Sequence, residues 1–113
     1  MAGQLARAVS YFIEACPSVV AVHDLATKVR IELVDGYLLD LYFNATLGKY
    51  TYALIREGQP VCVWDNAPHH PERANYPHHY HREDGSIEAS SLTGDPEQDI
   101  VLIAAAVSAQ FQK

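Results

Sequence analysis

The spacing of turns in the first two thirds of the chain constrains its fold more than any other feature. Four runs have the alternating or β-branched composition of strands: 19–34, 37–44, 49–57 and 61–65. The connections between them are short, and Asp35-Gly36 is a typical hairpin turn. Parallel pairing would need crossovers that such connections cannot hold. The sequence therefore predicts a mostly antiparallel meander sheet of four or five strands, with 19–34 forming one long or twice-broken strand.

Two helices are predicted to flank this sheet. Apolar residues at spacings of three and four predict a helix from about residue 2 to 15, which Pro17 closes; they are Leu5, Val9, Phe12, Ile13 and Cys16. Asp95 followed by Pro96 is typical of a second helix start. Its buried stripe would be Ile100, Ile103, Val107 and Phe111. We therefore expect one α+β domain over residues 1–113, with residues 83–94 polar enough to be partly mobile.

Charge and hydropathy argue against several classes of protein. The net charge of −6, with histidine neutral, argues against a broad basic surface that coats nucleic acid. No uninterrupted apolar run reaches about 18 residues, and no secretory signal pattern is present, so we expect a cytoplasmic protein with no membrane contact. Cys16 and Cys62 are isolated from each other, which signals neither a zinc knuckle nor a disulfide framework.

The histidine-rich segment from Trp64 to His81 is the strongest indication of function. It holds five of the six histidines in the chain: His69, His70, His78, His79 and His81. Its three prolines predict a structured loop or a linker rather than a continuous helix or a central strand. Three uses compete for such a cluster, namely acid–base catalysis, metal ligation, and surface polarity in a loop that prolines shape.

Metal ligation is an alternative that the residues leave open. His79 and His81 lie two positions apart, so both rings point the same way on an extended segment. His69 or His70 could complete a three-ligand site if the loop folds back. No cysteine lies nearby, and the fixed helical spacing of zincins is absent. We therefore expect chemistry without a cofactor and keep a metal-dependent hydrolase as the alternative.

Cleavage of RNA through its own 2′-hydroxyl needs a base, an acid and a cation for the crowded phosphate, and this segment offers all three. Two of the histidines could act as base and acid, and Lys49, Arg73 or Arg82 could stabilise the phosphorane charge. The candidates for contacts with unpaired RNA are Trp64, Tyr76, Tyr80 and Arg82. Supporting candidates are Asp65, Asn66 and Glu72, of which the two carboxylates could orient an imidazole. Which histidine acts as base and which as acid stays open.

Three blocks of the sequence resemble the TumE family of toxin–antitoxin proteins: GKYTYALI at 48–55, WDNAPHHPE at 64–72 and PHHYH at 77–81. The resemblance covers mainly the chain from Val29 to Gly85. It implies a small toxin that acts as a ribonuclease on cellular RNA and is neutralised by a cognate antitoxin, typically a helix-turn-helix protein. The positions that carry the resemblance most clearly are the five histidines named above, preceded by Trp64, Asp65 and Asn66.

Residues and resemblance together predict an endoribonuclease toxin that cuts single-stranded RNA by histidine acid–base catalysis. We expect an antitoxin to cover the histidine-rich segment and hold the toxin inactive. The alternatives are a histidine-ligated metal protein and a non-catalytic interaction module. The sequence does not fix the oligomeric state, and a homodimer is compatible with it.

Overall fold

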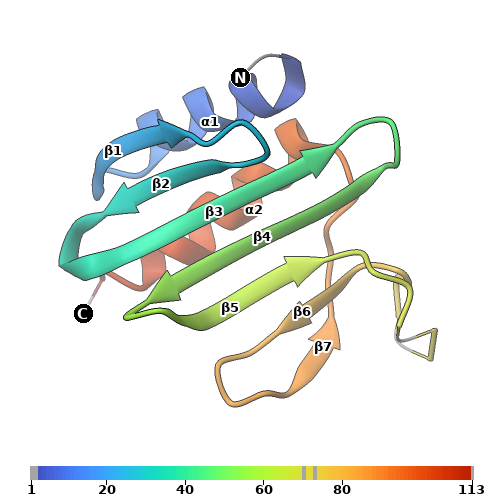
Figure 1. The fold of residues 1–113 in the computed structure, drawn as a ribbon. Coiled ribbons are helices and arrows are strands. Elements are labelled where there is room, and N and C mark those ends of the chain that lie inside the picture. The colour runs from blue at the N-terminus through green and yellow to red at the C-terminus, as the bar shows by residue number, and fades with distance from the viewer. Residues whose placement is uncertain (1–2, 70, 73, 113) are drawn as a thin grey trace.

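The computed structural model describes residues 3–69, 71–72 and 74–112 of the chain (Figure 1). In this part, one helix precedes and one helix follows a run of seven strands. The elements are α1 (Gly3–Ala15), β1 (Val19–Asp24), β2 (Val29–Leu33), β3 (Tyr37–Asn44), β4 (Lys49–Arg56), β5 (Gln59–Asp65), β6 (His79–His81), β7 (Ile87–Ala89) and α2 (Pro96–Ala109). None of the described helices is both long enough and apolar enough to cross a membrane.

The strands form one sheet in the order β1 to β7, and every neighbouring pair is antiparallel. The predicted α+β meander with two flanking helices is therefore confirmed. The described part of the sheet has more than the expected four or five strands for two reasons. A turn at residues 25–28 divides the run 19–34 into two strands, closed by a hydrogen bond from the Leu25 amide to the Lys28 carbonyl. In addition, β6 lies in the segment predicted as a structured loop or a linker, and β7 lies in the stretch predicted to be partly mobile.

Local chemistry explains two boundaries that the sequence predicted. Asp35 and Gly36 both have positive φ, at 61° and 77°, as a primed hairpin turn requires between two right-twisted strands. Asp95 caps α2, because its carboxylate accepts a hydrogen bond of 2.9 Å from the Glu97 amide, and Pro96 occupies the first turn of the helix. These signals are local, so they could be read without knowledge of the tertiary structure.

The two faces of the sheet differ. Both helices lie on one side of it, here called the covered face (Figure 1). Strand alternation directs Tyr50, Tyr52 and Leu54 of β4 into the core between sheet and helices. The intervening side chains, such as Thr51 and Ala53, lie on the opposite, open face, where no described helix packs.

A charged cluster joins strands on the open face. The Asp40 carboxylate of β3 accepts two hydrogen bonds from Arg30, of 2.8 and 2.9 Å, and one of 2.9 Å from Lys28. These contacts, that with Arg30 above all, hold the pKa of Asp40 below its ordinary value against the opposing effect of burial. Asp40 is therefore a charged tie between β3 and the start of β2.

Candidate active site

The pairing of β5 with β6 brings three of the predicted site residues together. Asp65, the last residue of β5, lies directly opposite His79, the first residue of β6. His81 follows two positions later, so its ring lies on the same face as that of His79. Asp65 also pairs with Thr51 of β4, which places all three side chains on the open face.

Both imidazoles contact one carboxylate. Nε2 of His79 lies 2.6 Å from Oδ1 of Asp65, and Nε2 of His81 lies 3.1 Å from Oδ2. The two rings meet edge to face, with their centroids 4.7 Å apart. Exposure rises across the group, because the side chain of His79 is 2% exposed, that of Asp65 17% and that of His81 34%. The outer imidazole is therefore open to solvent, and the inner one is not.

The inner imidazole faces an acceptor at each ring nitrogen. Besides the contact to Asp65, Nδ1 of His79 lies 3.0 Å from the carbonyl oxygen of Pro77. Neither a carbonyl nor a carboxylate oxygen can donate a proton, so satisfying both contacts requires a proton on each nitrogen of His79. In that form the ring is a cation held against Asp65. Of the contacts described above, His81 makes one, from Nε2 to Asp65. Its Nδ1 is therefore available to accept a proton.

The loop of residues 66–78 is tied to the sheet near both ends. The side chain of Asn66 donates to the Gly48 carbonyl at 2.7 Å and accepts from the Tyr50 amide at 3.0 Å. Near the other end, the side-chain amide of Asn75 donates to the backbone carbonyl oxygens of Ser90 and Leu92. These bonds also hold residues 90–92, part of a stretch that the sequence suggested to be partly mobile, and Leu92 is buried in the core.

His78 lies apart from its two neighbours in the sequence. Its Nδ1 is 2.8 Å from the hydroxyl of Tyr50, and its ring stacks on that of Tyr50 at a centroid distance of 5.8 Å. Burial lowers the pKa of His78, although Asp99 opposes that shift. Because Tyr50 belongs to the core on the covered face, this contact holds His78 on the other side of the sheet from His81.

Trp64 and Tyr80, predicted as candidates for contacts with unpaired RNA, face the covered side. They pair directly across β5 and β6 and alternate with Asp65 and His79 along the two strands. Their rings pack together at 5.1 Å, and Trp64 is 7% exposed. A strand that presents Asp65 to the open face must direct Trp64 into the core.

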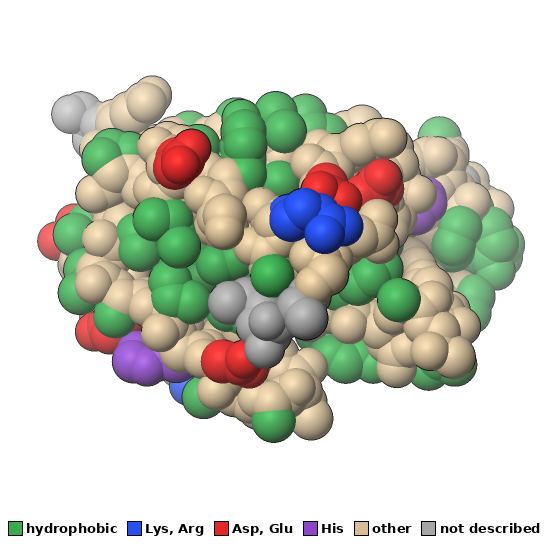
Figure 2. Space-filling model, turned by 90° about the horizontal axis from the view of Figure 1, so that it is seen from above, with side chains coloured by type: hydrophobic (Ala, Val, Ile, Leu, Met, Phe, Trp, Pro, Cys, Tyr) green, Lys and Arg blue, Asp and Glu red, His purple; other side chains and the backbone are tan. Residues whose placement is uncertain are grey.

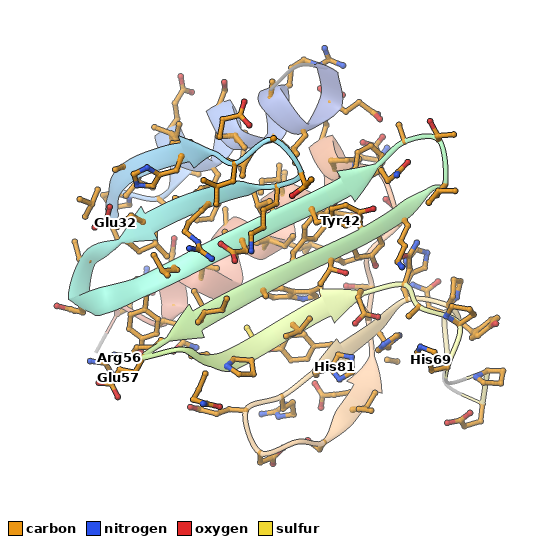
Figure 3. The ribbon with its side chains drawn as sticks, viewed as in Figure 1. Glu32, Tyr42, Arg56, Glu57, His69 and His81 are labelled. Atoms are coloured by element: carbon orange, nitrogen blue, oxygen red, sulfur yellow. The ribbon has the colours of Figure 1, made fainter. Side chains whose placement is uncertain are left out.

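The remaining predicted residues that the structure describes lie on the loop, at the start of β4 and just after β6. His69 and Glu72 are exposed on the loop, as is Tyr76, and Lys49 is exposed at the start of β4. In Figure 3, His81 extends from β6, whereas His69 lies on the loop beyond the end of β5. Arg82 is exposed and forms an ion pair of 3.0 Å with Glu88. His70 and Arg73 lie outside the described residues.

An open pocket lies beside His81. It is lined by Pro60, Val63, Asp65, His81 and residues of the 82–85 turn, and its volume of about 410 Å³ lies within the range of ligand pockets, about 300–1,000 Å³. No broad basic surface is visible on the side of the molecule drawn in Figure 2, where Lys and Arg side chains are sparse.

Among the described residues, one set of three offers donor atoms close enough to share a metal ion, and it is again Asp65, His79 and His81. The sequence suggested His69 or His70 as the third donor beside the histidine pair. Within the described chain, Asp65 takes that position instead. The two-residue spacing indicated the pair of His79 and His81. The role of Asp65 depends on the pairing of β5 with β6, which no pattern in the sequence indicated.

The fold and the site define a small α+β protein with a carboxylate–imidazole centre on an open sheet face. The family model described as Toxin TumE matches residues 10–111, which include every strand and the whole centre. The chain belongs to the TumE toxin family. No curated protein and no solved structure matches it. Membership in a toxin family implies an antitoxin partner.

Proposed function

We propose that this toxin is an endoribonuclease in which Asp65 and His81 form the general base. The observation that carries the proposal is the contact between Nε2 of His81 and Asp65, on an imidazole that is a third exposed and lines an open pocket. A proton on Nε2 that is donated to Asp65 leaves a lone pair on Nδ1. A carboxylate that fixes the tautomer in this way is the arrangement of the catalytic triads.

His79 serves this base as a positioning residue. Its side chain is too buried to touch a substrate, but it donates to the other oxygen of Asp65 and so fixes the orientation of the carboxylate. A doubly protonated His79 also supplies the positive charge that offsets Asp65 in this partly buried place. The base therefore consists of three residues, of which only His81 meets the RNA.

The proposed reaction is an intramolecular transfer of the phosphoryl group from the 5′-oxygen to the 2′-oxygen. Nδ1 of His81 takes the proton of a ribose 2′-hydroxyl, whose oxygen attacks the adjacent phosphorus. The 5′-oxygen leaves with a proton from an acid, and the products are a 2′,3′-cyclic phosphate and a 5′-hydroxyl. Our candidates for the acid and for the cation that stabilises the phosphorane are the exposed side chains around the site, His69, Lys49 and Arg82. Tyr76, exposed on the loop, is the candidate for stacking on an unpaired base.

The remaining parts of the proposal concern the cell. An RNA-cutting toxin acts where cellular RNA is, so we expect it in the cytoplasm. We expect its antitoxin to be a helix-turn-helix protein that covers the loop and the open face around His81, because blocking the single exposed imidazole of the centre would stop catalysis.

Cleavage of an end-labelled RNA by the purified protein in excess EDTA tests the proposal. The wild type should leave cyclic phosphate ends, and His81→Ala should not. His23→Ala is the matched control, because His23 is also an imidazole on this sheet paired with a carboxylate, 3.3 Å from Glu32, and it is remote in the strand order. Equal cleavage by wild type and His81→Ala would reject His81 as the base. Absence of cleavage with or without divalent metal would favour an interaction module.

A further inference from the structure

The three atoms that face one another in the centre are all metal-ligand atoms. One ligand atom from each of Asp65, His79 and His81 lies within 4.8 Å of the other two. Ligand atoms around a tetrahedral Zn²⁺ are roughly 3.3 Å apart. The two imidazoles contact different oxygens of Asp65, at 2.6 Å to Oδ1 and 3.1 Å to Oδ2. Both distances lie below that spacing, and the upper limit of 4.8 Å lies above it. Small side-chain shifts would therefore bring the set to the geometry of an ion.

The hydrogen bond of His79 sets its orientation for a ligand. Because the Pro77 carbonyl can only accept, it keeps a proton on Nδ1 of His79 and directs Nε2 at Asp65. A lone pair on Nε2 would be repelled by a carboxylate oxygen 2.6 Å away, so the contact requires a cation between them. A proton is one such cation, and a metal ion is another. Metal-ligating histidines commonly donate their second ring nitrogen to a carbonyl in this manner.

Donor type and access narrow the class of ion. Two imidazoles and one carboxylate, without a thiolate, suit Zn²⁺ and neighbouring divalent transition metals better than Mg²⁺ or Ca²⁺, which prefer all-oxygen sites. The inner ligand, His79, is buried, whereas His81 opens to the pocket and gives an ion a route from solvent. Three protein ligands leave a fourth position for water.

We propose that Asp65, His79 and His81 form a binding site for a divalent transition metal ion of the Zn²⁺ type, and that the bound ion silences the nuclease. The silencing rests on the function proposed above, whereas the binding does not. On binding, the Nε2 proton of His79 leaves to solvent, and the proton of His81 moves from Nε2 to Nδ1. The Nδ1 lone pair that would accept the 2′-hydroxyl proton is then gone, so the metal and the base compete for one imidazole.

The binding test needs no RNA. Tag-free protein is titrated with Zn²⁺ in a calorimeter and with Co²⁺ under a visible spectrometer, which reports a tetrahedral site with nitrogen and oxygen ligands. We expect one ion per chain, with affinity at least about tenfold weaker in His81→Ala and Asp65→Asn. His23→Ala, which removes the other imidazole–carboxylate pair, should match the wild type. Absence of a tetrahedral spectrum in the wild type, or equal affinity in His81→Ala, would overturn the site.

The silencing test adds Zn²⁺ to the cleavage reaction. We expect cleavage to be lost once Zn²⁺ exceeds the protein and restored by EDTA. Faster cleavage with Zn²⁺ would overturn the silencing and indicate a metal-dependent hydrolase, and unchanged cleavage by protein that binds the ion would overturn it too. If no RNA is cut under any condition, the proposed function fails and the silencing with it, while the spectrum still decides whether the site binds metal.

Discussion

Asp65 and Asp40 lie on the same open face, and each contacts two basic side chains, yet their partners differ in one property. Asp40 accepts from Arg30 and Lys28, which stay charged across the whole physiological range. The partners of Asp65 are His79 and His81, imidazoles whose two ring nitrogens can each donate or accept a proton. The same geometry therefore gives a fixed tie between strands in one place and a group able to move a proton in the other.

The largest expected effect separates the two carboxylates by activity. Asp65→Asn should lower the rate of RNA cleavage by about 10²–10⁴-fold, because an amide can present its NH₂ to His81 and favour the wrong tautomer. Asp40→Asn should leave the rate within about twofold, since its partners belong to the tie between β2 and β3. Single-turnover cleavage of one labelled RNA by both variants measures this.

Two outcomes would break the comparison. An equal loss of rate in both variants would mean that Asp65 acts through the integrity of the sheet, as Asp40 does. Full activity in Asp65→Asn would remove the carboxylate from the mechanism. Circular dichroism of both variants shows whether each is folded, so that loss of the fold is not mistaken for loss of the base.

The second prediction concerns stability instead of activity, and its measure is the free energy of unfolding. Asp40→Asn should cost about 1–2 kcal/mol at neutral pH, because hydrogen bonds to charged groups contribute more than neutral ones, reduced here since Lys28 and Arg30 are each about a third exposed. Urea unfolding followed by tryptophan fluorescence measures this, because the single Trp64 lies in the core. A variant as stable as the wild type would show that the cluster contributes nothing net.

What the sequence could predict followed from local signals. The Asp35-Gly36 turn and the alternation in β3 and β4 identified the meander, and the Asp95 cap identified α2. The apolar spacing from Leu5 to Cys16 identified α1. The run 19–34 was predicted as one long or twice-broken strand. The position of its break could not be located because the turn contains no glycine, and Ala26 adopts a φ of 70° there. The short strands β6 and β7 were missed because three residues are too few for a periodic pattern. Pairing with β5 stabilises β6, and pairing with β6 stabilises β7.

The site was predictable as a segment but not as an arrangement. Five neighbouring histidines read alike in the sequence, yet strand alternation sends His79 and His81 to the open face and the contact with Tyr50 holds His78 on the covered one. That separation depends on where β6 begins, which is a tertiary property. For the same reason Trp64 could not be distinguished from a surface aromatic before the register of β5 was known.

The third prediction uses this division of the histidines. Tyr50→Phe removes the hydroxyl 2.8 Å from His78 and should cost about 1 kcal/mol of unfolding free energy, the usual value of one hydrogen bond. Cleavage should stay within about twofold of the wild type, because the hydroxyl belongs to the covered face and not to the centre around Asp65. A loss of cleavage comparable to that of Asp65→Asn would show that the two faces are coupled through β6.

The smallest expected effect is the pH dependence, in acid, of the stability that Asp40 contributes. It tests whether the contacts of Asp40 depend on its charge. Its folded pKa lies below the ordinary value of 3.8, chiefly because Arg30 donates to the charged form. As the pH falls from about 5 through that folded pKa, the unfolded chain binds this proton before the folded one does, so the stability that Asp40 contributes is lost. The gap in unfolding free energy between wild type and Asp40→Asn should therefore be widest at neutral pH and narrow in acid.

Urea midpoints of both proteins measured across that interval test this, and because the other carboxylates are common to both, their contributions cancel in the difference. A gap that stays constant down to about pH 3 would mean that Asp40 stabilises the sheet by packing rather than by charge.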